Sequence, residues 1–285
     1  MGDIGSVNVV TTMHRGGYEL YGRKMIRSFL QHWPSNTTLT VYAEDFQPEE
    51  SSDRLEVLDL HATCPELLAF KKATIFPWQK GLIGPNVARE TGLKQTDSYD
   101  YKFDALKFSN KVFAYCKQAT RTTAPYMVWL DADTVTLKPV PEDFIASLGD
   151  GFLYYLGRRY MHSECGFMRF DLRHPNAQLF FKTMQAMYES GEIYTLNEWH
   201  DSFVFDTVRS VLCASGTIDA HSISSYDVPR HPFVNSVLGD YMDHLKGNRR
   251  KARGASASRD RRKESLLHKL LKKLQLKSLN VAKET

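Results

Sequence analysis

The sequence predicts an α/β protein built on a mixed, mostly parallel sheet flanked by helices. Three observations lead to this fold class. Strand-like apolar runs alternate with amphipathic segments along most of the 285 residues, which is the rhythm of strand–helix–strand units. The run Met127–Leu130 is apolar at every position, as in a parallel strand covered on both faces. Hydrophobic residues make up 42% of the chain, which is enough for one sizeable core.

The N-terminal part predicts strands over residues 7–12, 39–42 and 55–60. A Gly-containing loop follows the first strand and leads into a helix over residues 21–32. Pro34 ends that helix, because proline cannot continue one. This succession favours parallel strands with helices packed against them.

Residues 61–101 follow neither the helical nor the strand period and contain a Gly-Pro break. We therefore expect an insertion over one rim of the sheet. It could be a lid over an acceptor site or an ordinary covering loop, and the sequence leaves both open. A helix over residues 104–119 then places Val112 and Phe113 inward and leads into the strand at residues 127–130.

The remaining part of the predicted domain alternates strands and helices. Strands are expected over residues 152–156 and 164–170, and Gly166 in the second strand allows another group to approach the backbone closely. The expected helices span residues 142–148, 176–190 and 198–212.

Charge divides the chain into two regions. From Lys246 onward there are 14 Lys and Arg against 3 Asp and Glu, whereas the rest of the chain carries 23 basic and 30 acidic residues. Residues 248–263 are rich in Gly, Ser, Ala and Arg, which predicts a flexible linker. We therefore expect one domain over residues 1–247, then a basic linker and helical tail over residues 248–285. A tail of this charge indicates an anionic partner.

Cysteine usage and hydropathy indicate a cytoplasmic protein. The four cysteines form no CxxC pair, so we expect reduced thiols and neither a cysteine-based zinc site nor a redox motif. No stretch reaches the ~20 apolar residues that span a bilayer. The N-terminus has no basic region followed by an apolar one, which is the pattern of a secretion signal.

Asp131 and Asp133 directly follow the apolar strand. In extended backbone, residues two apart face the same side, so both carboxylates are expected to face one point. Adjacent anions repel unless a cation lies between them, and ligands of open α/β sheets bind at the carboxyl ends of strands. The pair therefore predicts a cation site. The alternative is a solvated turn, because Asp-x-Asp is common by chance.

With the elements in this order, residues 7–250 resemble the GT-A glycosyltransferases, which use nucleotide-diphospho-sugar donors. The layout is similar to the glycogenin and lipopolysaccharide galactosyltransferase group. The matching segments are Thr11–Met13, Phe103–Lys111, the Asp-x-Asp motif in Leu130–Asp133, Glu164–Met168, Trp199–Ser202 and a late His-x-x-Gly in His244–Gly247. The Lys-Pro-Trp that follows in the group is absent, and Asn248–Lys251 stands there instead.

The resemblance implies a divalent cation held by Asp131, Asp133 and His244. Two carboxylates and one imidazole suit Mn²⁺ better than Mg²⁺, which prefers oxygen ligands. Without the resemblance, His244 would be interpreted as a surface histidine ahead of a basic linker.

The resemblance also implies a set of donor-binding residues, with a UDP-sugar favoured. Tyr18 could stack on the base. Lys107 and Lys111 lie four apart on one helix face, and Lys107 is preferred because a solvated position is at least as good an interpretation of Lys111. The expected donor-binding residues are Thr11, Thr12, Tyr18, Asp104, Lys107, Asp131, Lys246 and Arg249.

Asp201 is the first candidate for the catalytic residue beside the reacting sugar carbon, and Glu164 is the competing carboxylate. His162 and His200 are lesser candidates. In an inverting reaction Asp201 would be the general base for the acceptor hydroxyl. In a retaining reaction it would position the acceptor or stabilise positive charge on the sugar. The alternative is a helix N-terminal carboxylate favoured by the helix dipole.

Residues 265–280 predict an amphipathic helix on an anionic membrane surface, because leucines share one face and lysines the other. Packing on the domain or an oligomer contact are alternatives. No aromatic residues interleave the tail as in nucleic-acid arms, so no nucleic-acid partner is expected. The leucines are Leu266, Leu267, Leu270, Leu271 and Leu274.

The sequence thus predicts a metal-dependent glycosyltransferase, peripheral on the cytoplasmic face of the membrane. It would move a sugar to a glycan or lipid-linked glycan acceptor during synthesis of a cell-surface polysaccharide. One alternative is a sugar-nucleotide nucleotidyltransferase, which would need a Gly-rich phosphate loop that the sequence lacks. The other is a non-catalytic membrane- or nucleic-acid-binding protein.

Overall fold

A seven-stranded sheet in the order β3-β2-β1-β4-β7-β6-β8 forms the centre of the protein in the computed structural model. The structure describes residues 5–92, 95, 98–224, 231–245, 255–256 and 260. Neighbouring strands are parallel from β3 to β4 and between β6 and β8, whereas β7 is antiparallel to both β4 and β6. The predicted mixed, mostly parallel sheet is therefore confirmed.

The strands of both sheets have the following bounds: β1 Val7–His14, β2 Thr37–Glu44, β3 Leu55–Asp59, β4 Tyr126–Leu130, β5 Thr134–Thr136, β6 Leu153–Leu156, β7 Glu164–Asp171, β8 Ala220–Ser222 and β9 Met242–His244. The α-helices are α1 Arg15–Gly17, α2 Arg23–His32, α3 Leu60–Thr63, α4 Pro65–Ala73, α5 Pro85–Thr91, α6 Ala105–Arg121, α7 Ala177–Glu189 and α8 Asp201–Ala214. One π-helical turn (η1, Tyr18–Gly22) and short 3₁₀ turns (η2 Pro77–Gln79, η3 Tyr101–Phe103, η4 Ala146–Leu148, η5 Glu192–Thr195, η6 Phe233–Asn235, η7 Val237–Asp240) connect them.

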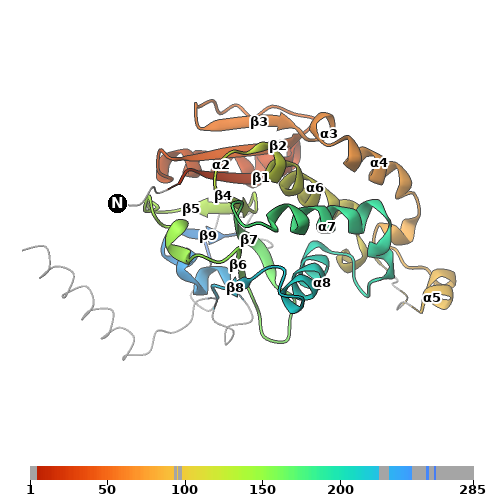
Figure 1. The fold of residues 1–285 in the computed structure, drawn as a ribbon. Helices are drawn as coiled ribbons and strands as arrows, with labels where there is room; N and C mark the ends of the chain where they lie inside the picture. The colour runs from red at the N-terminus through yellow and green to blue at the C-terminus, as the bar shows by residue number, and fades with distance from the viewer. Residues whose placement is uncertain are drawn as a thin grey trace, which may run out of the picture.

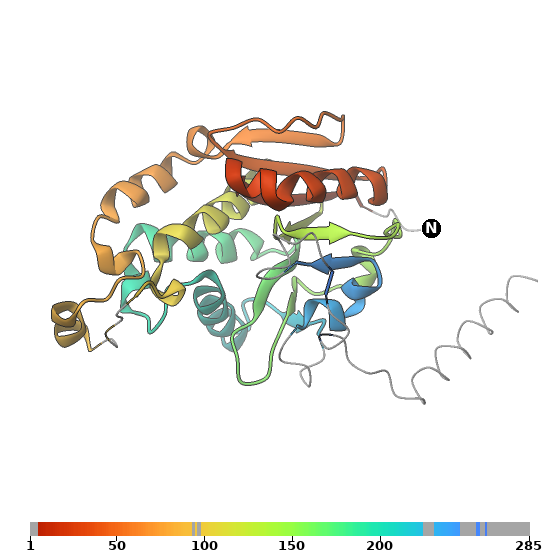
Figure 2. The same ribbon diagram turned by 180° about the vertical axis from the view of Figure 1, so that it is seen from behind.

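Helices lie on both faces of the sheet. Helices α6, α7 and α8 lie on the face turned toward the viewer in Figure 1, and α2 lies on the opposite face, in front in Figure 2. The first face buries aromatic residues such as Phe113 and Phe180, and the second buries Ile26 and Phe29. Both faces of β4 are therefore covered, as its uninterrupted apolar sequence predicts.

The antiparallel strand β7 determines where the site forms. Because β7 runs against β4, its first residues lie beside the carboxyl end of β4, and Leu130 pairs with Phe167. The small sheet of β5 and β9 brings the C-terminal strand of the described domain to the carboxyl end of β4, since Thr134 pairs with His244. Three segments far apart in sequence thus meet after Leu130.

Several predicted elements differ in the structure. The expected helix over residues 142–148 contains only the 3₁₀ turn η4, and the helix expected from Glu198 begins at Asp201 because His200 has an extended backbone. The insertion expected over residues 61–101 contains most of α3, which lies against β2 and β3, and then α4 and α5, which extend beyond the sheet at one end of the molecule (Figure 1).

The four cysteines are free, as expected, and Cys64, Cys116 and Cys165 are buried. Part of the predicted flexible linker contacts the domain: the Ser256 amide donates to Asp243 Oδ2 at 2.7 Å, and Asn235 Nδ2 donates to the carbonyl of Asp260 at 2.7 Å. The tail helix predicted at residues 265–280 lies outside the described residues. Within the described ranges, every helix is too short or too polar to cross a membrane.

Candidate active site

Asp131 and Asp133 lie on a turn immediately after β4. The Thr134 amide donates to the Asp131 carbonyl at 3.0 Å, so the backbone is turned here and the expected extended conformation is wrong. The carboxylates still converge, because the chain on both sides is fixed. The Asp131 amide donates to the Gly166 carbonyl of β7, and the Leu245 amide after β9 donates to the Asp133 carbonyl, each at 3.0 Å.

His244, the last residue of β9, lies between three carboxylates. Its Nε2 is 2.8 Å from Asp133 Oδ1 and 3.6 Å from Asp131 Oδ2. Its Nδ1 is 2.8 Å from Glu164 Oε1. Burial alone would lower the pKa of His244, but the carboxylates of Asp133 and Glu164 raise it to about 10. The interpretation of His244 as a surface histidine is therefore wrong, since only 5% of the residue is exposed.

Glu164, the competing catalytic candidate, contacts the imidazole on the side away from Asp133. A carboxylate on one ring nitrogen fixes the tautomer and turns the other nitrogen toward a metal, which is a recurrent arrangement around metal-binding histidines. Glu164 is 5% exposed, on the first residue of β7. Its position fits orientation of His244 better than contact with a substrate.

Gly166 makes room for His244. A Cβ atom at position 166 would lie 2.8 Å from Cε1 and 2.9 Å from Nδ1 of the imidazole, which is closer than carbon atoms pack. The close approach that this glycine predicted is therefore made by the imidazole of His244.

Lys111 crosses from α6 into the same cluster. Its Nζ is 3.0 Å from Asp131 Oδ1 and 2.8 Å from Asp201 Oδ2, and it also donates to the carbonyl of Cys165. Although burial alone would lower it, the two carboxylates raise the pKa of Lys111, which therefore stays charged. The solvated position considered for Lys111 is therefore wrong, because Lys111 is buried, whereas donor binding by the exposed Lys107 stays a prediction.

Asp201 begins α8 and is 8% exposed. Burial alone would raise its pKa, but Lys111 holds the pKa of Asp201 below its usual range. Asp201 is thus an ionised carboxylate linked through Lys111 to Asp131. We call Asp131, Asp133, Glu164, Asp201, Lys111 and His244 together the carboxylate cluster.

The N-terminal donor-binding candidates make contacts within the domain. Tyr18 is 4% exposed, packs on Phe46, and donates its hydroxyl hydrogen to Glu50 Oε2 at 2.8 Å, which leaves little ring surface for stacking on a base. Thr12 donates to the Tyr42 carbonyl at 2.7 Å. Thr11 is fully buried in β1.

Asp104 and Lys107 form the start of α6. Asp104 caps the helix: its Oδ1 accepts from the Lys107 amide at 2.9 Å and its Oδ2 from the Tyr99 hydroxyl at 2.9 Å. Lys107 is exposed, with its ammonium group near the rings of Tyr99 and Phe108. Lys246 and Arg249 lie outside the described residues.

Trp129 is a site residue that the sequence did not indicate. Its Nε1 donates to Asp131 Oδ1 at 2.7 Å, and the Lys111 ammonium lies 5.0 Å from its ring centroid. The signal available in the sequence was its position in the apolar run, two residues before Asp131. The indole and the ammonium together fix one oxygen of Asp131, while Oδ2 faces His244.

The donor set fits a divalent cation. One ligand atom from each of Asp131, Asp133 and His244 lies within 4.8 Å of the others. Two carboxylates and one imidazole are ligands that Mn²⁺ accepts, and the Glu164 contact supplies the outer support that such histidines have. Asp131, Asp133 and His244, the expected metal ligands, therefore suit that role. His162 and His200 belong to a second group of potential ligands, together with Glu198.

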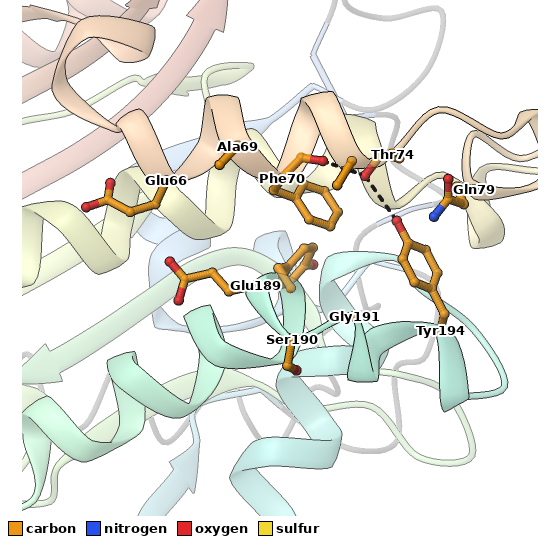
Figure 3. A pocket seen from close by; sticks show the side chains of 11 residues that line it. Glu66, Ala69, Phe70, Thr74, Gln79, Glu189, Ser190, Gly191 and Tyr194 are labelled. Atoms are coloured by element: carbon orange, nitrogen blue, oxygen red, sulfur yellow. Dashed lines mark hydrogen bonds between the residues drawn. The ribbon is translucent and has the colours of Figure 1, made fainter.

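A separate hollow of about 500 Å³ lies between α4 and the C-terminal end of α7 (Figure 3). Figure 3 shows the Thr74 hydroxyl turned toward that of Tyr194, at 3.1 Å, with Phe70 beside them. No residue of the carboxylate cluster lines this hollow. It is not part of the site described above.

The sequence matches no protein-family model, and no curated protein is significantly similar to it. Solved structures that match in chain trace include mouse xyloside xylosyltransferase 1 (11% identity, 77% of this chain and 85% of that one, TM-score 0.46). Another is the bifunctional glycosyltransferase WbbM (12% identity, 72% of this chain and 37% of that one, TM-score 0.43). A third is the glycosyltransferase GlyE of Streptococcus pneumoniae (13% identity, 71% of this chain and 43% of that one, TM-score 0.40).

Replacing Gly166 by alanine should weaken metal binding without unfolding the domain. The new methyl group would push the His244 imidazole away from Asp133 and Glu164. Loss of the supporting contact of a metal ligand typically costs about 10- to 100-fold in affinity, so we expect at least the lower value for Mn²⁺ measured by calorimetry. Gly84→Ala is the control, because an added Cβ there has no neighbour within 4 Å. Unchanged Mn²⁺ affinity in Gly166→Ala would contradict this site.

Replacing Lys111 by methionine should destabilise the protein by about 3–5 kcal/mol, because it leaves buried carboxylates without their cation. Lys107→Met, on the exposed end of the same helix face, should change the free energy of unfolding by less than about 0.5 kcal/mol. Urea denaturation measures both.

The Lys111 effect should depend on pH. A carboxylate whose folded pKa is lowered stabilises the fold above its unfolded pKa, and this contribution disappears as the pH falls through the folded value. The difference in the free energy of unfolding between the wild type and Lys111→Met should therefore become smaller at acidic pH. Equal stability of the two lysine variants at pH 7 would rule out the bridging role.

Proposed function

We propose that the protein is a metal-dependent glycosyltransferase that transfers a sugar from a nucleotide-diphosphate-sugar. One observation carries the proposal: ligand atoms of Asp131, Asp133 and His244 converge after β4, and Glu164 supports the imidazole from behind. These are the residues that the resemblance to the GT-A glycosyltransferases nominated, and His244 lies 111 positions from Asp133. Chance would rarely bring this set together.

The chain's own residues would bind and orient the donor. Asp131, Asp133 and His244 would hold Mn²⁺, or Mg²⁺, which when bound offsets the negative charge that develops on the leaving diphosphate. Lys246 and Arg249 lie two and five residues after β9 in the sequence, and we propose that they contact the diphosphate as charged donors. A UDP-sugar remains the favoured donor class. Among the N-terminal donor-binding candidates, Thr12 is the least buried.

Asp201 is proposed to act as a fixed negative charge beside the reacting sugar. A general base works best when its pKa lies near the working pH, whereas Lys111 lowers the pKa of Asp201. An ionised carboxylate of this kind suits stabilisation of positive charge on the sugar in the transition state. This favours the retaining alternative over the inverting one.

The acceptor is proposed to be a glycan or lipid-linked glycan, reached while the basic tail rests on an anionic membrane. The support comes from the tail sequence, where leucines on one face and lysines on the other match an interfacial helix. The protein would then be peripheral on the cytoplasmic face, where a membrane-bound acceptor is accessible.

Metal dependence is the central test of the function. With a panel of nucleotide-sugars and Mn²⁺, we expect release of nucleoside diphosphate by the wild type and its loss after chelation. Asp133→Ala should abolish it, because the metal loses a charged ligand. Asp143→Ala removes an exposed carboxylate and should keep full activity.

Two outcomes would overturn the function. Turnover that persists in the chelator or in Asp133→Ala would remove the metal from the reaction. Release of pyrophosphate from a nucleoside triphosphate and a sugar phosphate would instead identify a nucleotidyltransferase.

Removal of residues 264–285 should abolish co-sedimentation with phosphatidylserine vesicles. This truncation keeps Ser256 and Asp260, which contact the domain, so the body should stay folded. A full-length variant with Leu267, Leu270 and Leu271 changed to serine keeps the tail's charge and should also lose most binding, because an interfacial helix needs its apolar face. Undiminished binding of the truncated chain would refute the membrane role of the tail.

A further inference from the structure

His162, Glu198 and His200 form a second group of potential metal ligands outside the carboxylate cluster. Glu198 and His200 precede α8, and His162 lies on the long loop between β6 and β7, seen at the lower edge of Figure 1. One ligand atom from each lies within 4.8 Å of the others. The group is next to the carboxylate cluster in sequence, since His200 precedes Asp201, but it shares no residue with it.

The distances suit a tetrahedral metal ion. Glu198 Oε2 is 2.9 Å from His200 Nε2 and 3.3 Å from His162 Nε2. Ligands ~2.1 Å from a tetrahedral Zn²⁺ lie about 3.4 Å apart. Glu198 Oε2 therefore lies at nearly the spacing that zinc needs from a nitrogen of each imidazole, and one ligand atom from each of the two histidines lies within 4.8 Å of the other. His162, with a side chain 37% exposed, leaves an approach from solvent.

Glu198 and His200 are held by the residue between them. Trp199 is fully buried against Trp78, Phe103 and Tyr194, and its amide donates to the Lys102 carbonyl at 2.6 Å. The Lys102 ammonium binds Glu198 Oε1 at 2.9 Å, which orients the carboxylate and leaves Oε2 facing both imidazoles.

His162 is held by separate contacts. Arg158 Nε donates to its carbonyl at 2.6 Å. The next residue, Ser163, is anchored to α8 through Asp206, which accepts from the serine amide at 2.8 Å and from its hydroxyl at 2.6 Å. Three ligands on two separately anchored backbone segments form a preorganised site, which is what tight metal binding requires.

We propose that His162, Glu198 and His200 bind a Zn²⁺ ion, with water or another ligand in the fourth position. Two imidazoles and one carboxylate form a donor set that zinc uses in open sites, whereas the two carboxylates and one imidazole of the first site suit Mn²⁺. The ion joins the β6–β7 loop to the start of α8, beside Asp201. This site does not depend on the proposed function.

Zinc stoichiometry tests the site in the full-length protein. Because zinc also competes for the first site, Asp133→Ala is used to weaken that site. Measured by competition with a colorimetric zinc chelator, the wild type should bind two equivalents and Asp133→Ala one. His162→Ala should also bind one equivalent of zinc, and the double variant, which combines Asp133→Ala with His162→Ala, should bind none. Glu198→Gln, which keeps the size of the side chain, should lose the same equivalent as His162→Ala.

His61→Ala is the matched control. His61 is a histidine beside one carboxylate, Asp45 at 3.5 Å, without a second imidazole, and its removal should leave both equivalents bound. Circular dichroism and thermal unfolding check that each variant is folded, and His162 is exposed enough for this to be expected. Equal zinc stoichiometry in folded Asp133→Ala and in the folded double variant would overturn the proposal.

Discussion

The compensation of buried negative charge is the constraint on which the site depends. Asp133, Glu164 and Asp201 are buried beside the half-buried Asp131, and an uncompensated carboxylate there would be costly. Lys111 serves Asp131 and Asp201, while His244 serves Asp133 and Glu164. The two cations come from opposite faces of the sheet region, α6 and β9, so the charge pattern also fixes how these elements pack. A divalent cation would displace the proton from His244, because metals bind the neutral imidazole, and would leave the cluster with one more positive charge.

The sequence predicted the parts of this arrangement that depend on local pattern. The apolar run before Asp131 indicated a covered strand, and Gly166 indicated a close approach to the backbone, which His244 makes. The convergence of Asp131 and Asp133 was predicted for a wrong reason. The chain turns after Leu130, and contacts with β7 and β9 bring the carboxylates together, not strand alternation.

The sequence could not predict side-chain contacts that depend on the tertiary packing. Lys107 and Lys111 occupy equivalent positions on a helical projection, and only the place where α6 crosses the sheet buries Lys111 and leaves Lys107 in water. Glu164 was the carboxylate that competed with Asp201 for the catalytic role, and only the antiparallel direction of β7 places it against His244 Nδ1. Tyr18 was expected at a ligand, but its hydroxyl satisfies Glu50 in the interior.

The pairing of β5 with β9 has a consequence for biosynthesis. His244 contacts Asp133 across a separation of 111 residues, so the cluster stays incomplete while the intervening chain is still being translated. Contacts this distant in sequence form late, because loop closure must precede them. During that interval the nascent domain holds Asp133 and Glu164 without their imidazole. Completion of the cluster therefore waits for β9 to emerge from the ribosome, and ribosome-bound chains that stop before residue 244 lack one of the three proposed metal ligands.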